Sequence, residues 1–230
     1  MSRGPALSAA AYASWRRSAL GEVTERLEMR LVASLAAPVE GRRVLDAGTG
    51  DGAYAFAFAA DGARVTAVDR EVGMLAAARA RSPELGRGVA WCQASLEKLP
   101  FDDGAFDLVS AVTVFCFVHD PDRAVRELAR VLVPGGRLVL GELGPHSAWA
   151  AWRRARGWLG SAIWRHARFW SRAELVRLLE SAGLRPSVVR GAVYYPPLGL
   201  AARAFEVADP LLGRLCAPGA AFLAALGHKP

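Results

Sequence analysis

A glycine-rich turn carries the clearest chemistry in the sequence. Residues 44–52 read VLDAGTGDG, a β-rich run that leads into glycines and then into a helical pattern. Glycines let the backbone approach a ligand closely, and the following helix presents unpaired N–H groups at its amino terminus. Asp46 precedes the glycines, and a carboxylate there favours a cationic ligand because it would repel a pyrophosphate. Asp69 ends the next β-rich run, where an acidic residue can hold both hydroxyls of a ribose.

The elements around this turn alternate between strands and helices. The sequence predicts strands over residues 42–47, 64–68, 89–93, 106–112 and 137–142, and helices over residues 53–60, 72–81 and 122–132. The turn Pro134-Gly135-Gly136 separates the last helix from the last strand of this series. Strands that alternate with helices imply right-handed crossovers and a parallel sheet, so the sequence predicts a doubly wound α/β fold.

Further elements flank this series on both sides. Residues 19–36 carry apolar side chains at spacings of three and four, which predicts an amphipathic helix that ends at Pro38 and lies against the sheet or over its site. A helix is expected from Ser171, its N-cap, with Glu174 as the capping-box partner, to Ala182. A sixth strand over residues 184–190, a helical stretch to about Leu215 and a last strand over residues 219–226 complete a seven-stranded sheet.

Composition and charge exclude several classes of protein. A chain of 230 residues that is 53% apolar and 22% charged describes one globular domain rather than a disordered or fibrous protein. The longest uncharged apolar run, residues 108–118, is far short of the roughly 20 residues that a membrane span needs. The net charge of +7 is almost all arginine, with lysine only at Lys98 and Lys229, so it reflects composition as readily as an anionic partner.

The compartment follows from two further patterns. The amino-terminal segment lacks the basic, apolar and small-residue order of a secretory signal, which predicts a cytoplasmic protein that is at most peripheral at a membrane. The cysteines, Cys92, Cys116 and Cys216, lie far apart without paired spacing, so neither a disulfide framework nor a metal site is expected.

Four motifs, in order, carry a resemblance to a known family. They are VLDAGTGDG at residues 44–52, VTAVD at 65–69, LEKLPFDDGAFDLV at 96–109 and ELARVLVPGGRLVLGE at 127–142. On these motifs the chain resembles the class I S-adenosylmethionine-dependent methyltransferases, in the type 11 branch that includes quinone-biosynthesis methyltransferases. The resemblance implies a Rossmann-like, mostly parallel seven-stranded sheet and S-adenosylmethionine as the cofactor.

The resemblance also implies a set of cofactor-binding residues. They are Gly48, Thr49, Gly50 and Gly52 around the methionine part, Asp46 at its ammonium end, Asp69 at the ribose, Ser95 and Leu96 at the adenine, and Thr113 beside the methionine or the sulfonium. Family members often carry aspartate where this chain has Ser95. Serine can accept the hydrogen bond from the adenine amino group but lacks the charge that strengthens it, so we expect somewhat weaker cofactor binding.

Three residues are candidates for proton transfer. Methyl transfer from a sulfonium needs a base only when the acceptor arrives protonated, so a base is optional. His119 follows the fourth predicted strand, and Glu142 and His146 lie at the corresponding end of the fifth. The plain alternative for His119 is a solvated loop histidine, because the neighbouring Asp120-Pro121 is explained by turn chemistry alone.

Four aromatic residues are candidates for the substrate side: Tyr12, Trp15, Tyr194 and Tyr195. The first two resemble a segment that closes over the cofactor, and their spacing of three is equally typical of a helical pair that covers core. The other two lie in the last third of the chain, where they would line an acceptor pocket.

The insert at residues 143–170 is where we expect the acceptor to be recognised. It holds Trp149, Trp152, Trp158, Trp164 and Trp170 alongside Arg153, Arg154, Arg156, Arg165 and Arg168. Tryptophan interleaved with arginine is typical of a membrane interface, and it can also stack on nucleic-acid bases. A lipid surface is favoured over nucleic acid because no nucleic-acid motif accompanies the basic residues. The plain alternative is a cap whose tryptophans pack on the sheet while its arginines stay in water.

The sequence thus predicts an enzyme that transfers a methyl group from S-adenosylmethionine to a small or lipophilic acceptor by in-line displacement, without a metal. We expect a single domain with an amino-terminal lid (1–41), a cofactor-binding core (42–142), a cap insert (143–170) and a carboxy-terminal part (171–230). One alternative is a non-catalytic cofactor-binding module at a membrane surface. Another is an NAD(P)-dependent oxidoreductase, because Gly48, Gly50 and Ala53 satisfy a loose dinucleotide pattern, although Asp46 argues against it.

Overall fold

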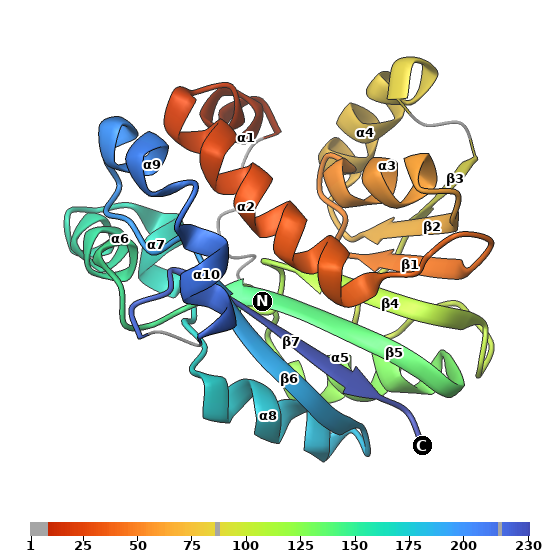
Figure 1. Cartoon of the computed structure of the whole chain (residues 1–230). Coiled ribbons are helices and arrows are strands. Elements are labelled where there is room, and N and C mark those ends of the chain that lie inside the picture. The colour runs from red at the N-terminus through yellow and green to blue at the C-terminus, as the bar shows by residue number, and fades with distance from the viewer. Residues whose placement is uncertain (1–8, 86–87, 216–217) are drawn as a thin grey trace.

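One seven-stranded sheet organises the computed structural model, which describes residues 9–85, 88–215 and 218–230 (Figure 1). The strands follow the order β3-β2-β1-β4-β5-β7-β6. They are β1 (Arg43–Ala47), β2 (Arg64–Asp69), β3 (Val89–Gln93), β4 (Phe106–Val112), β5 (Leu132–Leu143), β6 (Arg185–Ala192) and β7 (Phe222–His228). The predicted doubly wound α/β fold is therefore confirmed.

Strand directions bring the predicted site residues to one edge of this sheet. Strands β1 to β5 pair in parallel, and β7 runs antiparallel to both β5 and β6. Leu143 at the end of β5 and Ala192 at the end of β6 both pair with Phe222 at the start of β7. The last residues of β1, β2, β4, β5 and β6 consequently lie along one edge, called the carboxyl edge below, where ligands bind in parallel sheets.

Alternating side chains build a hydrophobic core on each face of the sheet. Leu108 of β4 packs in one core with residues of α2 (Ala19–Ala36) and α3 (Ala53–Ala60). Its neighbour Val109 packs in the other core with residues of α5 (Pro121–Arg130) and α8 (Arg172–Ser181). Because successive residues of a strand point to opposite faces, a strand buried on both sides reads as a continuous apolar run. The apolar run at residues 108–118 is accordingly a buried strand followed by a loop.

The predicted amphipathic helix is α2, which packs against the sheet. The Ser18 side chain caps it by accepting a hydrogen bond from the Gly21 N–H at 3.0 Å, and Val23 and Leu27 lie on its buried face. A Cβ on Gly21 would overlap the carbonyl oxygen of Trp15, so glycine lets the chain turn sharply here. The preceding helix, α1 (Ala9–Arg16), thereby folds back towards the carboxyl edge.

Several predicted boundaries need correction. The strand expected at residues 137–142 is β5, which begins five residues earlier and contains Pro134-Gly135-Gly136. The physical reason is tertiary pairing: the Gly135 N–H donates to the Lys229 carbonyl, and the Lys229 N–H donates to the Gly136 carbonyl, each at 2.9 Å. The preceding helix, α5, ends at Arg130 rather than at Leu132. The helix after β2, α4 (Val72–Leu85), continues past its expected end.

The carboxy-terminal strands also shift relative to the expected ranges. Strand β6 continues to Ala192, and β7 begins at Phe222 rather than at Gly219, because these strands pair with each other along their length. The helix α8 shows the expected capping box, with Ser171 and Glu174 bonded in both directions. The expected helical stretch is confirmed as two short helices, α9 (Gly199–Phe205) and α10 (Asp209–Arg214).

Five helices gather at the carboxyl edge (Figure 1). They are α1, α9, α10 and the two helices of the insert, α6 (Ala148–Trp158) and α7 (Ala162–His166). In the described part of the chain, no helix is both long and apolar enough to cross a membrane. The fold therefore surrounds one edge of the sheet with segments from both ends of the sequence.

Candidate active site

The glycine turn and Asp69 meet at the carboxyl edge. The Gly48 and Thr49 N–H groups donate to the Val68 carbonyl at 2.8 and 2.9 Å, which ties the turn to the end of β2. The Asp69 carboxylate accepts the Gly50 N–H at 2.8 Å and the Glu71 N–H at 2.9 Å. Burial raises the pKa of Asp69, and these two hydrogen bonds oppose that rise. Each carboxylate oxygen still has room for another donor, as a pair of ribose hydroxyls requires.

The glycines of the turn are needed for different reasons. A Cβ on Gly48 would overlap the Val114 side chain, so this glycine allows the loop after β4 to pack against the turn. Gly50 has φ +56°, and a Cβ there would meet no atom of the described residues within 4 Å. Gly52 has φ +86°, and its Cβ would press on the Trp91 ring at 2.8 Å. Only the Gly50 part of the turn faces open space beside Asp69, where a ligand can approach the backbone.

Asp46 lies buried under the turn and is bonded to it. Its Oδ2 accepts the Thr49 hydroxyl at 2.5 Å, and its carboxylate also accepts the Ala55 N–H. Burial raises the pKa of Asp46 to about 7, and the hydrogen bonds from Thr49 and Ala55 oppose that rise. The two predicted cofactor residues Asp46 and Thr49 are thus brought together, with the hydroxyl of Thr49 turned inward to the carboxylate.

The loop after β4 is held in a strained conformation by Glu142. Thr113 has φ +52°, which is unusual for a β-branched residue, and its N–H donates to the Gly141 carbonyl at 2.6 Å. The Val114 and Phe115 N–H groups donate to Glu142 Oε1 at 3.0 and 2.7 Å. Glu142 is fully buried, and burial raises its pKa to about 8. These contacts hold the loop directly after Thr113, and a proton-transfer role for Glu142 stays a prediction.

The two candidate histidines lie on the outside of the carboxyl edge. His119 and His146 are both exposed, the first in the loop before α5 and the second in the turn before α6. Asp120 caps α5, since its Oδ1 accepts the Arg123 N–H at 2.9 Å. This cap explains the Asp120-Pro121 pair without any role for His119. A proton-transfer role for either histidine stays a prediction.

The predicted adenine contacts lie next to Asp69. The Ala94 N–H donates to the Asp69 carbonyl at 3.2 Å, which places the segment after β3 beside the end of β2. Ser95 is exposed, and its hydroxyl accepts the Glu97 N–H at 3.3 Å, whereas the Leu96 side chain is buried. Ser95 and Leu96 thus follow β3 close to the end of β2, and their contact with the adenine stays a prediction.

Helix α1 is fastened to the glycine motif by an ion pair that sequence reasoning missed. The Arg16 guanidinium lies 2.6 Å from Asp51 and 2.7 Å from Glu25. Asp51 belongs to the glycine motif and also pairs with Arg81 of α4 at 2.7 Å. The charges come from segments far apart in the sequence, so no spacing could reveal them.

The predicted aromatic pair of the lid is formed within α1. The Tyr12 and Trp15 rings are stacked with centroids 6.0 Å apart, and both side chains are half-buried. Burial raises the pKa of Tyr12 well above its usual range, and the nearby Glu28 adds to this rise. The pair packs on the core, as a helical pair that covers core would. It also belongs to a helix that is ion-paired to the glycine motif, as a segment that closes over the cofactor would be.

The two candidate tyrosines after β6 have different surroundings. Tyr195 is buried in the core beneath α2, where its hydroxyl lies 2.9 Å from the Thr24 hydroxyl, so the expectation that it lines an acceptor pocket needs correction. Tyr194 is half-buried against the other core. Val193, just before them, has φ +64°, and Asp209 holds this strained turn by accepting the Val193 and Tyr194 N–H groups at 3.0 and 2.7 Å.

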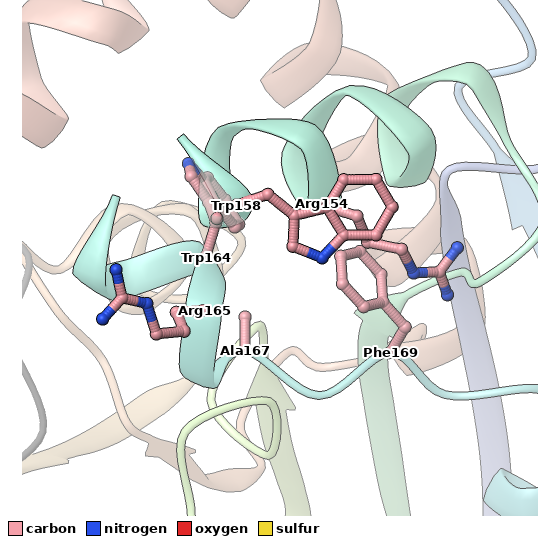
Figure 2. Close-up of a pocket in the computed structure, with 7 residues that line it drawn as sticks. Arg154, Trp158, Trp164, Arg165, Ala167 and Phe169 are labelled. Atoms are coloured by element: carbon pink, nitrogen blue, oxygen red, sulfur yellow. The ribbon is translucent and has the colours of Figure 1, made fainter. Parts of the chain in front are cut away.

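The cap divides its tryptophans between interior and surface. Trp149 and Trp170 are fully buried, whereas Trp158 is 85% exposed. A pocket of about 230 Å³ lies between α6 and α7, lined by Arg154, Gly157, Trp158, Trp164, Arg165, Ala167 and Phe169. Figure 2 shows the Trp158 indole beside Phe169 and Arg154, with Arg165 pointing to the opposite side. The packed-cap interpretation therefore holds for the inner tryptophans but not for Trp158.

The remaining groups considered are metal-binding clusters and cysteine thiols. These residues contain no group of three or more histidine, cysteine, aspartate or glutamate side chains that would hold a metal ion. Cys92 and Cys116 are free thiols, and Cys216 lies outside the described residues.

Comparisons with known proteins agree with this geometry. A family model described as a methyltransferase domain matches residues 45–140. A ubiquinone biosynthesis O-methyltransferase of Idiomarina loihiensis is 32% identical over 165 residues, which are 69% of this chain and 68% of that protein. A demethylmenaquinone methyltransferase of Thermus thermophilus is 40% identical over 141 residues, which are 60% of this chain and 58% of that protein.

A solved structure extends the similarity to nearly the whole chain. It is that of an S-adenosylmethionine-dependent methyltransferase, a possible histamine N-methyltransferase, from Thermotoga maritima. The two chains superpose with a TM-score of 0.73 at 25% identity, over 95% of this chain and 94% of the other. Taken with the glycine turn and Asp69 at the carboxyl edge, these similarities show that the chain belongs to the class I S-adenosylmethionine-dependent methyltransferases, with S-adenosylmethionine as its cofactor.

Proposed function

We propose that this methyltransferase acts on a small lipophilic acceptor with a hydroxylated ring of the quinone-precursor type. The observation that carries the proposal is the pocket of about 230 Å³ in the cap, which the aromatic side chains of Trp158, Trp164 and Phe169 line. Aromatic walls suit an apolar ring, because flat rings pack on one another with little polar surface left unpaired. The names of the two sequence relatives, which refer to ubiquinone and demethylmenaquinone, support the same acceptor class. The comparisons support neither the dehydrogenase nor the non-catalytic module.

The residues at the carboxyl edge fit the cofactor. The open space at Gly50 lies beside the Asp69 carboxylate, which suits a ribose close to the backbone. In this proposal Gly48, Thr49, Gly50 and Gly52 surround the methionine part, Asp46 contributes negative charge towards its ammonium group, and Ser95 and Leu96 meet the adenine. Thr113 follows β4 and, in its strained conformation, lies beside the methyl-bearing end.

The catalytic work of the chain is positioning and exclusion of water. S-adenosylmethionine supplies an electrophilic methyl group, and an in-line displacement requires the acceptor atom to lie directly opposite the departing sulfur. Glu142 holds the loop of Thr113, and Arg16 holds α1 over the glycine turn, so both sides of the reacting centre are fixed before substrate arrives. Water is excluded by α1 and the cap. His119 and His146 remain candidates for removing an acceptor proton from the rim.

A division of the chain follows from these roles. We propose that residues 1–41, of which 9–41 are described, act as the lid, that residues 42–142 bind the cofactor, and that residues 143–170 cap the acceptor. Residues 171–230 complete the sheet and the substrate side, where Tyr194 is the remaining tyrosine candidate.

The test is methyl transfer from labelled S-adenosylmethionine to defined acceptors, followed by partition into an organic phase. We expect label on reduced demethylmenaquinone or on an alkylated catechol, and none on histamine or on a soluble protein mixture. Label that appears only on amines or on protein would overturn the proposed acceptor class while leaving the methyltransferase assignment intact.

We further propose that the cap and the α9–α10 segment rest on an anionic lipid surface. Trp158 and Leu159 are 85% and 86% exposed, and Leu200 in α9 is 86% exposed at the same end of the molecule (Figure 1). The exposed Arg154 and Arg156 supply positive charge beside these apolar side chains. Binding to phosphatidylglycerol vesicles at low salt should fall when both arginines become glutamine. No change at any ionic strength would contradict the lipid contact.

A further inference from the structure

One arginine of the cap points inward and keeps donors without partners. Arg153 of α6 is only 6% exposed. Its Nε and Nη1 atoms are enclosed, and neither has a hydrogen-bond partner in the described part of the chain. A buried guanidinium without an acceptor is costly, because its N–H groups have lost water and gained nothing in return. Such a group in a native fold calls for an explanation by strain or by a ligand.

The rings beside Arg153 compensate its charge only in part. Its guanidinium carbon lies 5.0 Å from the Trp149 ring centroid and 5.1 Å from that of Trp164. The ring faces attract the cation, but they offer no acceptor for the N–H donors that lie in the guanidinium plane. Burial accordingly lowers the pKa of Arg153. Aromatic walls around unpaired planar donors are suited to a flat anion that reaches the guanidinium along its edge.

The titratable neighbours of Arg153 come from α2 and from the loop after β4, which border the candidate active site. Glu28 of α2 and Cys116 of the loop after β4 both interact with it electrostatically. Cys116 bonds to the carbonyl of Thr113, at a sulfur–oxygen distance of 3.4 Å, so Arg153 lies near the loop assigned to the reacting methyl. Glu28 forms no ion pair with Arg153 within 4.0 Å among the described residues. Burial raises the pKa of Glu28 to about 7, so at neutral pH it carries only part of a negative charge.

The other arginines of the cap are exposed and differ from Arg153. Arg154 donates to the Pro145 carbonyl at 2.9 Å, and Arg168 lies 3.3 Å from Glu174. Arg156 stacks on the exposed Trp152 ring at 4.9 Å. The inward position of Arg153 is therefore not a general property of an arginine-rich segment.

We propose that Arg153 binds a carboxylate on the acceptor, so that among hydroxylated aromatic acceptors the enzyme prefers an acid over the corresponding neutral ring. This inference rests on the proposed function, because it names the charged group of that same acceptor. A carboxylate matches the planar guanidinium with two parallel hydrogen bonds, and Trp164, whose ring centroid lies 5.1 Å from that guanidinium, also lines the pocket of the cap. The ring hydroxyl then lies away from Arg153, towards the loop of Thr113.

The test compares two probes that differ only in charge, 3,4-dihydroxybenzoate and 3,4-dihydroxybenzamide. Binding is measured by calorimetry on the full chain saturated with S-adenosylhomocysteine. We expect the native protein to bind the acid at least about tenfold more tightly than the amide, as a charge-assisted pair provides. In Arg153→Gln the preference should fall to within about twofold, while the affinity for the amide and for S-adenosylhomocysteine is unchanged. Arg156→Gln, on the outer face of α6, should keep the native preference.

Two further variants sharpen the assignment. Arg153→Lys keeps the charge but loses the planar fork, so it should retain only part of the preference. Glu28→Gln removes the nearby competing charge and should strengthen binding of the acid without affecting the amide.

Equal binding of acid and amide by the native protein would overturn the role of Arg153, and so would binding of neither probe. This comparison needs no variant and does not depend on whether Arg153→Gln folds. Methylation of neutral rings without a preference for acids would leave the proposed function standing and remove this inference. A preference for acids without methyl transfer to any ring would support the role of Arg153 and overturn the proposed function.

Discussion

The two sides of the carboxyl edge differ in how their charged groups are paired, although Glu142 Oε2 at the end of β5 is also enclosed without a partner in the described residues. On the cofactor side, Asp46 and Asp69 accept hydrogen bonds from the glycine turn or its neighbours. Asp51 pairs with Arg16 and Arg81. On the cap side, Arg153 keeps two enclosed nitrogens without partners in the described residues. A site with its polar atoms already paired is pre-organised, whereas a site with unpaired donors obtains its partners from what it binds.

This difference suggests that one part of the enzyme is shared with other methyltransferases and another part is specific for the acceptor. The paired side contains the glycine motif, within the region matched by the methyltransferase-domain family, residues 45–140. The side that contains Arg153 lies in the insert after that region. Fold and cofactor are thus shared with many proteins, while the acceptor is selected by groups that the fold itself does not specify. Four predictions can break or sharpen this comparison.

The largest effect is expected for Asp69→Ala on the cofactor side. The change removes a charged acceptor for two hydroxyls, each hydrogen bond contributing about 1.5–3 kcal/mol, so S-adenosylhomocysteine affinity should fall at least about 100-fold. Calorimetry measures the affinity, and circular dichroism checks that the fold persists. Asp102→Ala, at an exposed carboxylate, is the control and should bind normally. If the affinity of Asp69→Ala is unchanged, the ribose does not bind at Asp69.

The next effect concerns the pH dependence of stability. Burial raises the pKa of Glu142 to about 8 and that of Asp46 to about 7, above the value of about 4 for an unfolded carboxyl group. The folded chain therefore binds more protons than the unfolded chain between about pH 4 and pH 8, and its free energy of unfolding falls as the pH rises through that window. We expect a fall of at least about 2 kcal/mol from pH 5 to pH 8, measured by urea unfolding.

Glu142→Gln should flatten this pH profile, because its uncharged side chain does not titrate. The control is Glu127→Gln. The hydrogen bond from Arg130 lowers the pKa of Glu127, so its titration falls below the window and the slope from pH 5 to pH 8 should not change. If the free energy of unfolding of the native protein instead rises from pH 5 to pH 8, the pKa values of Glu142 and Asp46 are not raised by burial.

A smaller effect is expected for the ion pair that fastens α1. Arg16→Gln leaves Asp51 paired with Arg81, so the fold should persist. The loss of this largely buried ion pair costs only about 1 kcal/mol because Asp51 keeps Arg81, and it should speed dissociation of S-adenosylhomocysteine about fivefold. Stopped-flow competition measures the rate, and the exposed neighbour Arg17→Gln is the control. Equal dissociation rates in the two variants would mean that α1 does not restrain the cofactor.

The smallest effect is expected for Ser95→Asp. The added charge strengthens the hydrogen bond proposed for the adenine amino group and should raise S-adenosylhomocysteine affinity about threefold, measured by calorimetry. Ser95→Asn, which is similar in shape but uncharged, is the matched control and should gain less. A loss of affinity in Ser95→Asp would place the adenine elsewhere along the segment after β3.

The agreement between sequence and structure is best where local rules and tertiary structure coincide. Strands β3 and β4 and helices α2 and α3 have the predicted boundaries, because their apolar periodicity and their caps act within a few residues. The start of β5 could not be predicted, since Pro134-Gly135-Gly136 reads locally as a turn but pairs with Lys229 near the other end of the chain.

The candidate site divides in the same manner. The meeting of Gly50 with Asp69 was predictable, because parallel strands bring their carboxyl ends to one edge. The position of Tyr195 was not, because its aromatic ring suits a pocket and a core equally well and only Thr24 of α2 decides between them. The same holds for Arg16, whose partner Asp51 is 35 residues away in the sequence.

The sequence by itself determined the sheet, the glycine turn and the acidic strand ends, and with them the class of cofactor. These features depend on side-chain periodicity and on backbone freedom, which are properties of short segments. Only the tertiary structure decided which of the five arginines in the cap is enclosed and how Glu142 is used. Burial and the pairing of charges depend on the elements that pack around a residue, and those elements come from distant parts of the chain.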